Sequence, residues 1–266
     1  MPGRNPKKSA SRPSTASDSR PLAPIADKAL RSKKPGLHSR LTNSIGLDIV
    51  AGTYAEHQFL PRDTELMAQF GVSRTVLRES LKTLSAKGLI IARARVGTRV
   101  REREAWNFFD PDVLRWQFET GPDLKFLASL AEVRMAIEPE AAALATVRRS
   151  DEQAHLMMSW VDKMGEPQNT AEQFARYDLE FHRVVAEASD NPFMRSISAI
   201  VELALTAAFT ISSPVSEPAA FKRTVGIHRD IAAAIRDRNA DAAREAMRSA
   251  IREGYDRASR ARKDAG

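Results

Sequence analysis

The sequence predicts a mainly α-helical protein with two folded domains, an N-terminal winged helix-turn-helix domain with a small β wing and an all-α helical bundle. Three observations support this prediction. Residues 70–89 read FGVSRTVLRESLKTLSAKGL, in which a tight turn separates two amphipathic stretches. Residues 89–100 have strand-like ends around a small tip, as in a β-hairpin. From residue 124 onward, apolar residues recur at three- and four-residue spacing, which is typical of packed helices.

Composition and charge divide the chain into four segments. Residues 1–40 carry ten Lys or Arg against two Asp, so their net charge is +8, whereas residues 41–102 sum to +3 and the remainder to −4. We expect a disordered basic arm over residues 1–37, which either attracts DNA phosphates or serves as a solubilising leader. The winged domain is predicted over residues 38–102 and the bundle over residues 123–262. Between them, residues 103–122 are rich in aromatics and are predicted to dock on the bundle.

The helix predicted to begin at Arg74 has two different faces. Gly71 supplies the turn before it, and Ser73 occupies the N-cap position, where a hydroxyl accepts a backbone N–H. The apolar face holds Leu77, Leu81 and Leu84, and the basic face holds Arg74, Arg78 and Lys82. Because a recognition helix enters the DNA major groove with its first residues foremost, Arg74 and Arg78 are placed to reach guanine edges or phosphates. The alternative is a solvated basic face without a DNA partner.

This segment and the hairpin after it resemble the DNA-binding domain of GntR-family transcription regulators. The residues that carry the resemblance are Leu60-Pro61, Glu65-Leu66, Val72-Ser73-Arg74, Leu77-Arg78-Glu79, Leu81, Leu84, Gly88-Leu89 and Gly97-Thr98. The resemblance implies DNA contacts from Arg74 and Arg78 and from the wing tip around Arg95 and Gly97. The expected DNA-binding set also includes Ser73, Thr75 and Thr64. A family arginine is replaced by Thr64, so the operator bases read from that position are expected to differ.

One helix of the predicted bundle carries residues suited to a metal ion. Asp178 and His182 are four residues apart, which places a carboxylate and an imidazole on one helix face. His228, on a later helix, could join them across the bundle. With no cysteine in the chain, any metal site must use histidine and carboxylate ligands. The spacing alone equally fits a surface pair or a hydrogen-bonded core histidine.

The segments around these residues resemble the helical effector domain of the same GntR branch. They are EVRMAIEPEAAALA, YDLEFHRVVAEASDNP and IHRDIAAAIRDRNADAAREAM. The resemblance implies a divalent metal, commonly zinc, held by one Asp and three His, here Asp178, His182 and His228 with the third histidine position occupied by Ala250. Either the three residues bind a metal whose vacant positions take water or effector oxygens, or the histidines bind the effector directly. Glu253 could supply a substitute oxygen or be a solvated charge.

The effector implied by the resemblance is a small carboxylate bound beside the metal. Arg134 is the expected partner of that carboxylate, because its planar guanidinium makes paired hydrogen bonds, and the alternative is a buried pair with Glu138. The segment WNFFDPDVLRW is similar to regulators of sugar-acid operons, so an aldonate such as galactonate is the leading expectation. Lactate, a dicarboxylate or a fatty acyl group remains the alternative. The effector set is therefore Arg134, Asp178, His182 and His228.

The predicted function is ligand-responsive binding of a homodimer to a palindromic operator, with repression relieved by the effector. An enzyme is not expected, since the sequence contains no metalloprotease, nucleophile-elbow or phosphate-loop motif. An architectural DNA-binding protein without a ligand switch is the alternative class. No run of about 18 apolar residues is available to span a bilayer, and the N-terminus lacks a signal-peptide pattern. We therefore expect a bacterial cytoplasmic protein that associates with the nucleoid through DNA.

Overall fold

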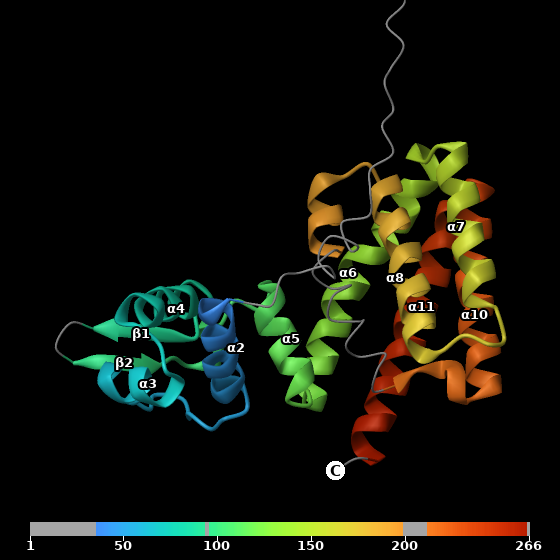
Figure 1. Ribbon diagram of the computed structural model, residues 1–266. Coiled ribbons are helices and arrows are strands. Elements are labelled where there is room, and N and C mark those ends of the chain that lie inside the picture. The colour runs from blue at the N-terminus through green and yellow to red at the C-terminus, as the bar shows by residue number, and fades with distance from the viewer. Residues whose placement is uncertain (1–35, 94–95, 199–211, 265–266) are drawn as a thin grey trace, which may run out of the picture. The chain divides into compact units, whose positions relative to one another are not determined.

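The structure is a computed structural model that describes residues 36–93, 96–198 and 212–264 (Figure 1). Almost all of its regular elements are helices, and one two-stranded sheet accompanies them. The predicted fold class is therefore confirmed. None of the helices in the described part of the chain is long and apolar enough to cross a membrane.

The winged helix-turn-helix contains three helices and a β-hairpin. The elements are α2 (Leu37–Val50), α3 (Asp63–Phe70), α4 (Arg74–Ala86), β1 (Ile90–Arg93) and β2 (Gly97–Val100). Gly71 ends α3 in the left-handed conformation, with φ of 62°, and Ser73 caps α4 by accepting a hydrogen bond from the backbone N–H of Val76. The strands pair antiparallel, with Ile90 opposite Val100. The turn, the cap and the hairpin are thus confirmed where the sequence predicted them.

The apolar face of α4 forms part of the winged-helix core. Leu77, Leu81 and Leu84 are buried there together with Leu41, Ile45 and Ile49 of α2. Gly88 follows α4 with φ of 83°, and a Cβ atom at this position would lie 2.2 Å from the carbonyl oxygen of Ala105. The chain can therefore pass close behind the recognition helix only because residue 88 is glycine.

The aromatic segment after the wing forms α5 (Pro111–Glu119), which packs largely against the winged helix. The Trp116 ring fills the space beside Gly46 of α2, and its indole N–H donates to Asn43 at 2.7 Å. Trp106 and Val113 belong to the same core. The prediction that this segment docks on the bundle was therefore incomplete, because the two tryptophans serve the winged helix. The opposite side of α5 packs against the bundle helices through Leu114 and Phe118.

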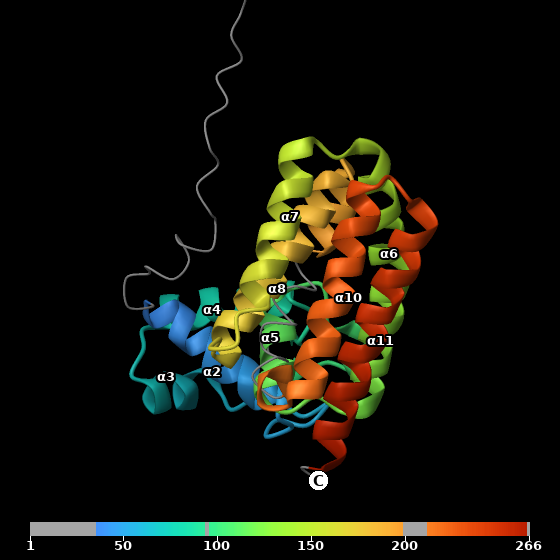
Figure 2. The same ribbon diagram turned by 90° about the vertical axis from the view of Figure 1, so that its right-hand side faces the viewer.

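The bundle contains α6 (Leu124–Arg148), α7 (Asp151–Met164), α8 (Ala171–Ala188), α10 (Pro218–Arg236) and α11 (Ala240–Asp264). Contacts join these helices in a closed ring in the order α6, α8, α7, α10 and α11, and Figure 2 shows them side by side. Ser150 and Thr170 begin α7 and α8 with reciprocal capping boxes to Gln153 and Gln173. The helix predicted from Pro192 to Ser212 begins at Pro192, and its part from residue 199 to 211 lies outside the described residues.

Candidate functional site

The residues predicted to contact DNA lie on the exposed side of the winged helix. Arg74, Arg78 and Lys82 are all exposed on α4, opposite its buried leucines. Thr75 and Thr64 are exposed as well, as are Ser73 and the wing residue Gly97. Arg95 lies outside the described residues. The described members of the predicted set therefore share one accessible region built by α3, α4 and the wing.

A groove runs between the recognition helix and the wing. Its lining includes Arg78, Lys82, Arg93 and Gly97. Three cationic side chains thus line this groove together with two acidic ones, Asp63 and Glu79. Binding of DNA phosphates along it stays a prediction.

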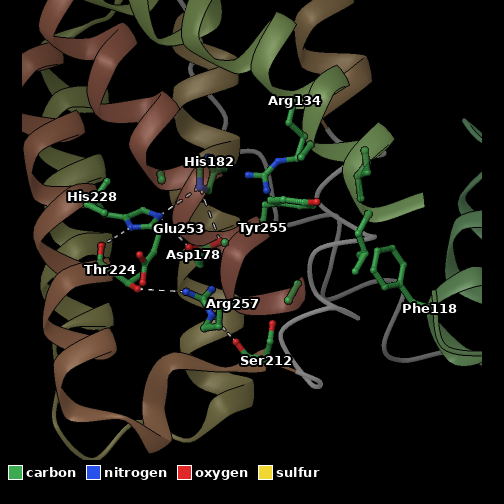
Figure 3. A pocket seen from close by; sticks show the side chains of 17 residues that line it. Phe118, Arg134, Asp178, His182, Ser212, Thr224, His228, Glu253, Tyr255 and Arg257 are labelled. Carbon is green, nitrogen blue, oxygen red and sulfur yellow. Dashed lines mark hydrogen bonds and ion pairs between the residues drawn. The ribbon is translucent and has the colours of Figure 1, made fainter. Parts of the chain in front are cut away.

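The three predicted metal ligands converge inside the bundle (Figure 3). Asp178 and His182 come from α8, and His228 comes from α10. His228 Nε2 lies 2.9 Å from Asp178 Oδ1 and 3.3 Å from His182 Nε2. His182 Nε2 lies 3.9 Å from Asp178 Oδ2. All three side chains are buried, so this is neither a surface pair nor a lone core histidine.

The arrangement fits a single cation. Two metal–ligand bonds of about 2.1 Å span at most about 4.2 Å, and the three measured separations all fall within that reach. The group of Asp178, His182 and His228 is the one that could hold a metal ion in the described part of the chain. Nδ1 of His228 lies 2.8 Å from the carbonyl oxygen of Thr224, which fixes Nε2 as the nitrogen that faces the site.

The electrostatics favour the metal-binding protonation state at Asp178 and His182 but favour a proton on His228. Burial alone would raise the pKa of Asp178, but His228, His182 and Arg134 together outweigh it, so the pKa lies below its usual value and the carboxylate stays ionised. Burial lowers the pKa of His182, which therefore stays neutral. Burial opposes protonation of His228 too, but the Asp178 carboxylate prevails and raises its pKa. A cation at this position would take the place of the proton on His228.

The metal group forms part of the wall of a cavity with about 60 Å³ of free space. Arg134 of α6 lines it and also pairs with Glu138, with Nε 2.6 Å from Oε1. The buried pair with Glu138 is therefore present, and the binding of an effector carboxylate by Arg134 stays a prediction. Ala250 lines the cavity from α11, and its methyl group offers no ligand atom. Glu253 lines it too, but its carboxylate accepts a hydrogen bond from Arg223 at 2.9 Å and is not in the metal group.

Arg257 also lines the cavity and was not predicted from the sequence. It lies seven residues after Ala250 on α11, so both occupy the same helix face, and this spacing could have revealed it. Its Nε donates to the carbonyl oxygen of Ser212 at 2.5 Å, and burial lowers its pKa. Figure 3 shows Arg134 and Arg257 approaching the cavity from different sides of the metal group. Thr224, one turn before His228, also lines the cavity and was missed.

Two known protein families match the chain, one over the winged helix and the other over the bundle. Residues 37–100 match the family described as bacterial regulatory proteins, gntR family. Residues 129–253 match the FCD domain. The first match covers the winged helix and the second covers Arg134, Asp178, His182 and His228.

The relatives are regulators. The chain is 31% identical to the Escherichia coli HTH-type transcriptional regulator YieP, covering 86% of this chain and 98% of the relative. It is 30% identical to the Escherichia coli galactonate operon transcriptional repressor, covering 80% and 92% of the two chains. The structure of Lar, which controls expression of the Listeria monocytogenes agr system, has the same fold, with a TM-score of 0.62 at 17% identity over 86% of this chain and 99% of Lar. The protein is therefore a DNA-binding transcription regulator of the GntR family, of the FadR type with an FCD domain.

Proposed function

We propose that this regulator is a homodimeric repressor of a sugar-acid catabolic operon and that it leaves a palindromic operator when the sugar acid binds in the bundle. Two copies are needed because one recognition helix covers only a few base pairs, and a two-fold axis matches a palindrome. The observation that carries the proposal is the convergence of Asp178, His182 and His228 on a cavity that arginines also line. An effector that binds in this cavity could change the affinity of the regulator for its operator.

In this proposal Asp178, His182 and His228 hold a divalent metal ion, with zinc favoured by the mixture of imidazole and carboxylate ligands. When bound, the ion would supply positive charge and coordination positions for carboxylate or hydroxyl oxygens. Ala250 leaves room on the side where a further ligand would otherwise stand, so effector oxygens or water could occupy it. The alternative, direct hydrogen bonding of the effector by the histidines, predicts a protein without metal.

The charge of the site favours an anion. Among the residues described, the charged side chains that line the cavity are Arg134, Asp178, Glu253 and Arg257. A divalent cation bound by Asp178, His182 and His228 would add two positive charges to it. An anionic effector would offset this excess, and a guanidinium fork is well suited to binding its carboxylate.

The similarity to a galactonate operon repressor directs the proposal to an aldonate such as galactonate. Thr224, Ser212 and Tyr255 bring hydroxyl groups to a cavity wall that is otherwise largely apolar, and these groups could bind a hydroxylated ligand. Arg134 and Arg257 line the same cavity, and this observation favours a small dicarboxylate as the second candidate.

Two measurements test the proposal. Elemental analysis of the purified wild type should find about one divalent ion per chain, absent from an Asp178→Ala/His182→Ala variant. The operator is then selected from random duplexes, and its release is followed by fluorescence anisotropy during titration with galactonate, gluconate, lactate and succinate. Release by an aldonate supports the proposal, whereas release by succinate alone favours the second candidate. No release by either aldonate, with metal present, would reject the sugar-acid class.

A further inference from the structure

Glu138 of α6 is a buried acid that lies behind the metal group. Its carboxylate accepts hydrogen bonds from Arg134, with distances of 2.6 Å to Nε and 3.2 Å to Nη2. Its Oε2 also lies 3.5 Å from Nδ1 of His182. Glu138 does not line the cavity, nor does it belong to the metal group. It contacts the site through Nδ1 of His182, the side of that ring away from the metal group, and through Arg134.

The Nδ1 atoms of the two histidines, which point away from the metal group, lie near different acceptors. A neutral imidazole whose Nε2 faces a cation carries its proton on Nδ1, which then needs an acceptor. His228 has the carbonyl oxygen of Thr224, 2.8 Å from its Nδ1. At the corresponding position behind His182 lies Oε2 of Glu138. A carboxylate is the stronger acceptor, and it raises the basicity of the nitrogen that binds metal.

Arg134 keeps Glu138 suited to this role. The guanidinium donates a hydrogen bond to each carboxylate oxygen, so both oxygens are fixed in place. Oε2 lies 3.5 Å from Nδ1 of His182, longer than an ordinary N–H···O bond by a few tenths of an ångström, and the hydrogen bond proposed here requires the two groups to approach by that amount.

We propose that Glu138 is a positioning residue for the metal centre, which fixes the tautomer and orientation of His182 by accepting the Nδ1 proton. The inference rests on the proposed metal site and adds a residue that never touches the ion. It also gives Arg134 a second task, since the same guanidinium lines the effector cavity and holds the acid that orients His182.

Zinc affinity tests this proposal in the full-length protein. Competition with a chromophoric chelator gives the zinc dissociation constant of the wild type and of Glu138→Gln, which keeps the shape but removes the charge. We expect zinc binding to weaken about 10- to 100-fold. Glu180→Gln is the matched control, because Glu180 is also a buried acid paired with an arginine, Arg183, on the helix that carries Asp178 and His182. It should leave the zinc affinity unchanged.

A spectroscopic measurement separates positioning from general stability. In zinc-loaded protein labelled with 15N-histidine, the Nδ1 proton signal of His182 should shift in Glu138→Gln, while that of His228 stays with its Thr224 acceptor. A folded Glu138→Gln or Glu138→Asp variant with wild-type zinc affinity and an unmoved His182 signal would overturn the inference. A wild type that binds neither zinc nor cobalt would instead refute the metal site itself.

Discussion

The recognition helix and the metal site differ in how far apart along the chain their working residues lie. The cap, the apolar face and the basic face of α4 all fall between Ser73 and Leu84. The site in the bundle joins Arg134 of α6, Asp178 and His182 of α8, His228 of α10 and Arg257 of α11. The first is a local arrangement that a short sequence window contains, whereas the second exists only after the helices have packed.

The two regions also differ in how their charges are accommodated. The arginines of α4 stay in water, so folding does not require partners for them. The charged groups around the bundle site are buried and must be satisfied by one another, because an unpaired buried charge costs several kcal/mol. Glu138 with Arg134, and Asp178 with His228, meet this requirement. Substitutions in the two regions should therefore have separable effects.

The largest expected effect is on stability, and it comes from a substitution in the core of the winged helix. It tests whether that domain can be destabilised without loss of the metal site. Leu84 is fully buried on the inner face of the recognition helix α4, so Leu84→Ala should destabilise the winged helix by about 2–5 kcal/mol. Calorimetry of the full chain should show this loss together with weaker operator binding, while the metal content stays at the wild-type value. Leu156→Ala is the control, because Leu156 is 42% exposed on α7. Loss of metal from Leu84→Ala would show that the regions are not separable.

A smaller effect on affinity, without loss of stability, is expected at the exposed surface. Arg78→Ala should weaken operator binding by about 1–3 kcal/mol if the guanidinium reads a guanine, and the preference at that base should relax. Arg229→Ala removes an equally exposed cation from α10 and should leave operator affinity unchanged. Anisotropy titrations at fixed salt measure both variants. Equal affinities for Arg78→Ala and the wild type would remove Arg78 from the DNA contacts.

The difference in locality explains which features the sequence could predict. Residues 71–84 contain a turn, a cap and two helix faces, so the recognition helix could be placed to the residue. Asp178 and His182 share one turn, and His228 could be named as a third candidate, but spacing alone could not decide whether the three meet, since it carries no information between helices. Arg257 was missed although it lies seven residues after Ala250 on the same face of α11. The packing of Trp116 on Gly46 was missed because it joins two helices far apart in the sequence.

Gly46 tests a long-range contact of the winged helix, the packing of Trp116 of α5 against α2. A Cβ atom at this position would lie 2.3 Å from the Trp116 ring, so Gly46→Ala should displace α5 and cost about 1–3 kcal/mol. Gly226→Ala, in a helix with open space around the new methyl group, should instead stabilise by about 0.5–1 kcal/mol. Thermal unfolding and Trp fluorescence compare the two. Equal stability of the two variants would mean that α5 can leave α2 without cost.

The smallest effect tests whether the local arrangement of α4 depends on its cap. Ser73 accepts the Val76 N–H at 3.4 Å, and Ser73→Ala removes that acceptor, so a loss of about 1 kcal/mol is expected. Arg74 follows the cap directly, so fraying of the first turn should also weaken operator binding. Ser73 is uncharged, so this loss of affinity would come from the displacement of Arg74. Ser73→Asp separates the two roles: it restores the cap and the stability, but its negative charge at the DNA surface should keep affinity low. If Ser73→Ala left both stability and operator affinity unchanged, the cap would not hold the recognition helix in place.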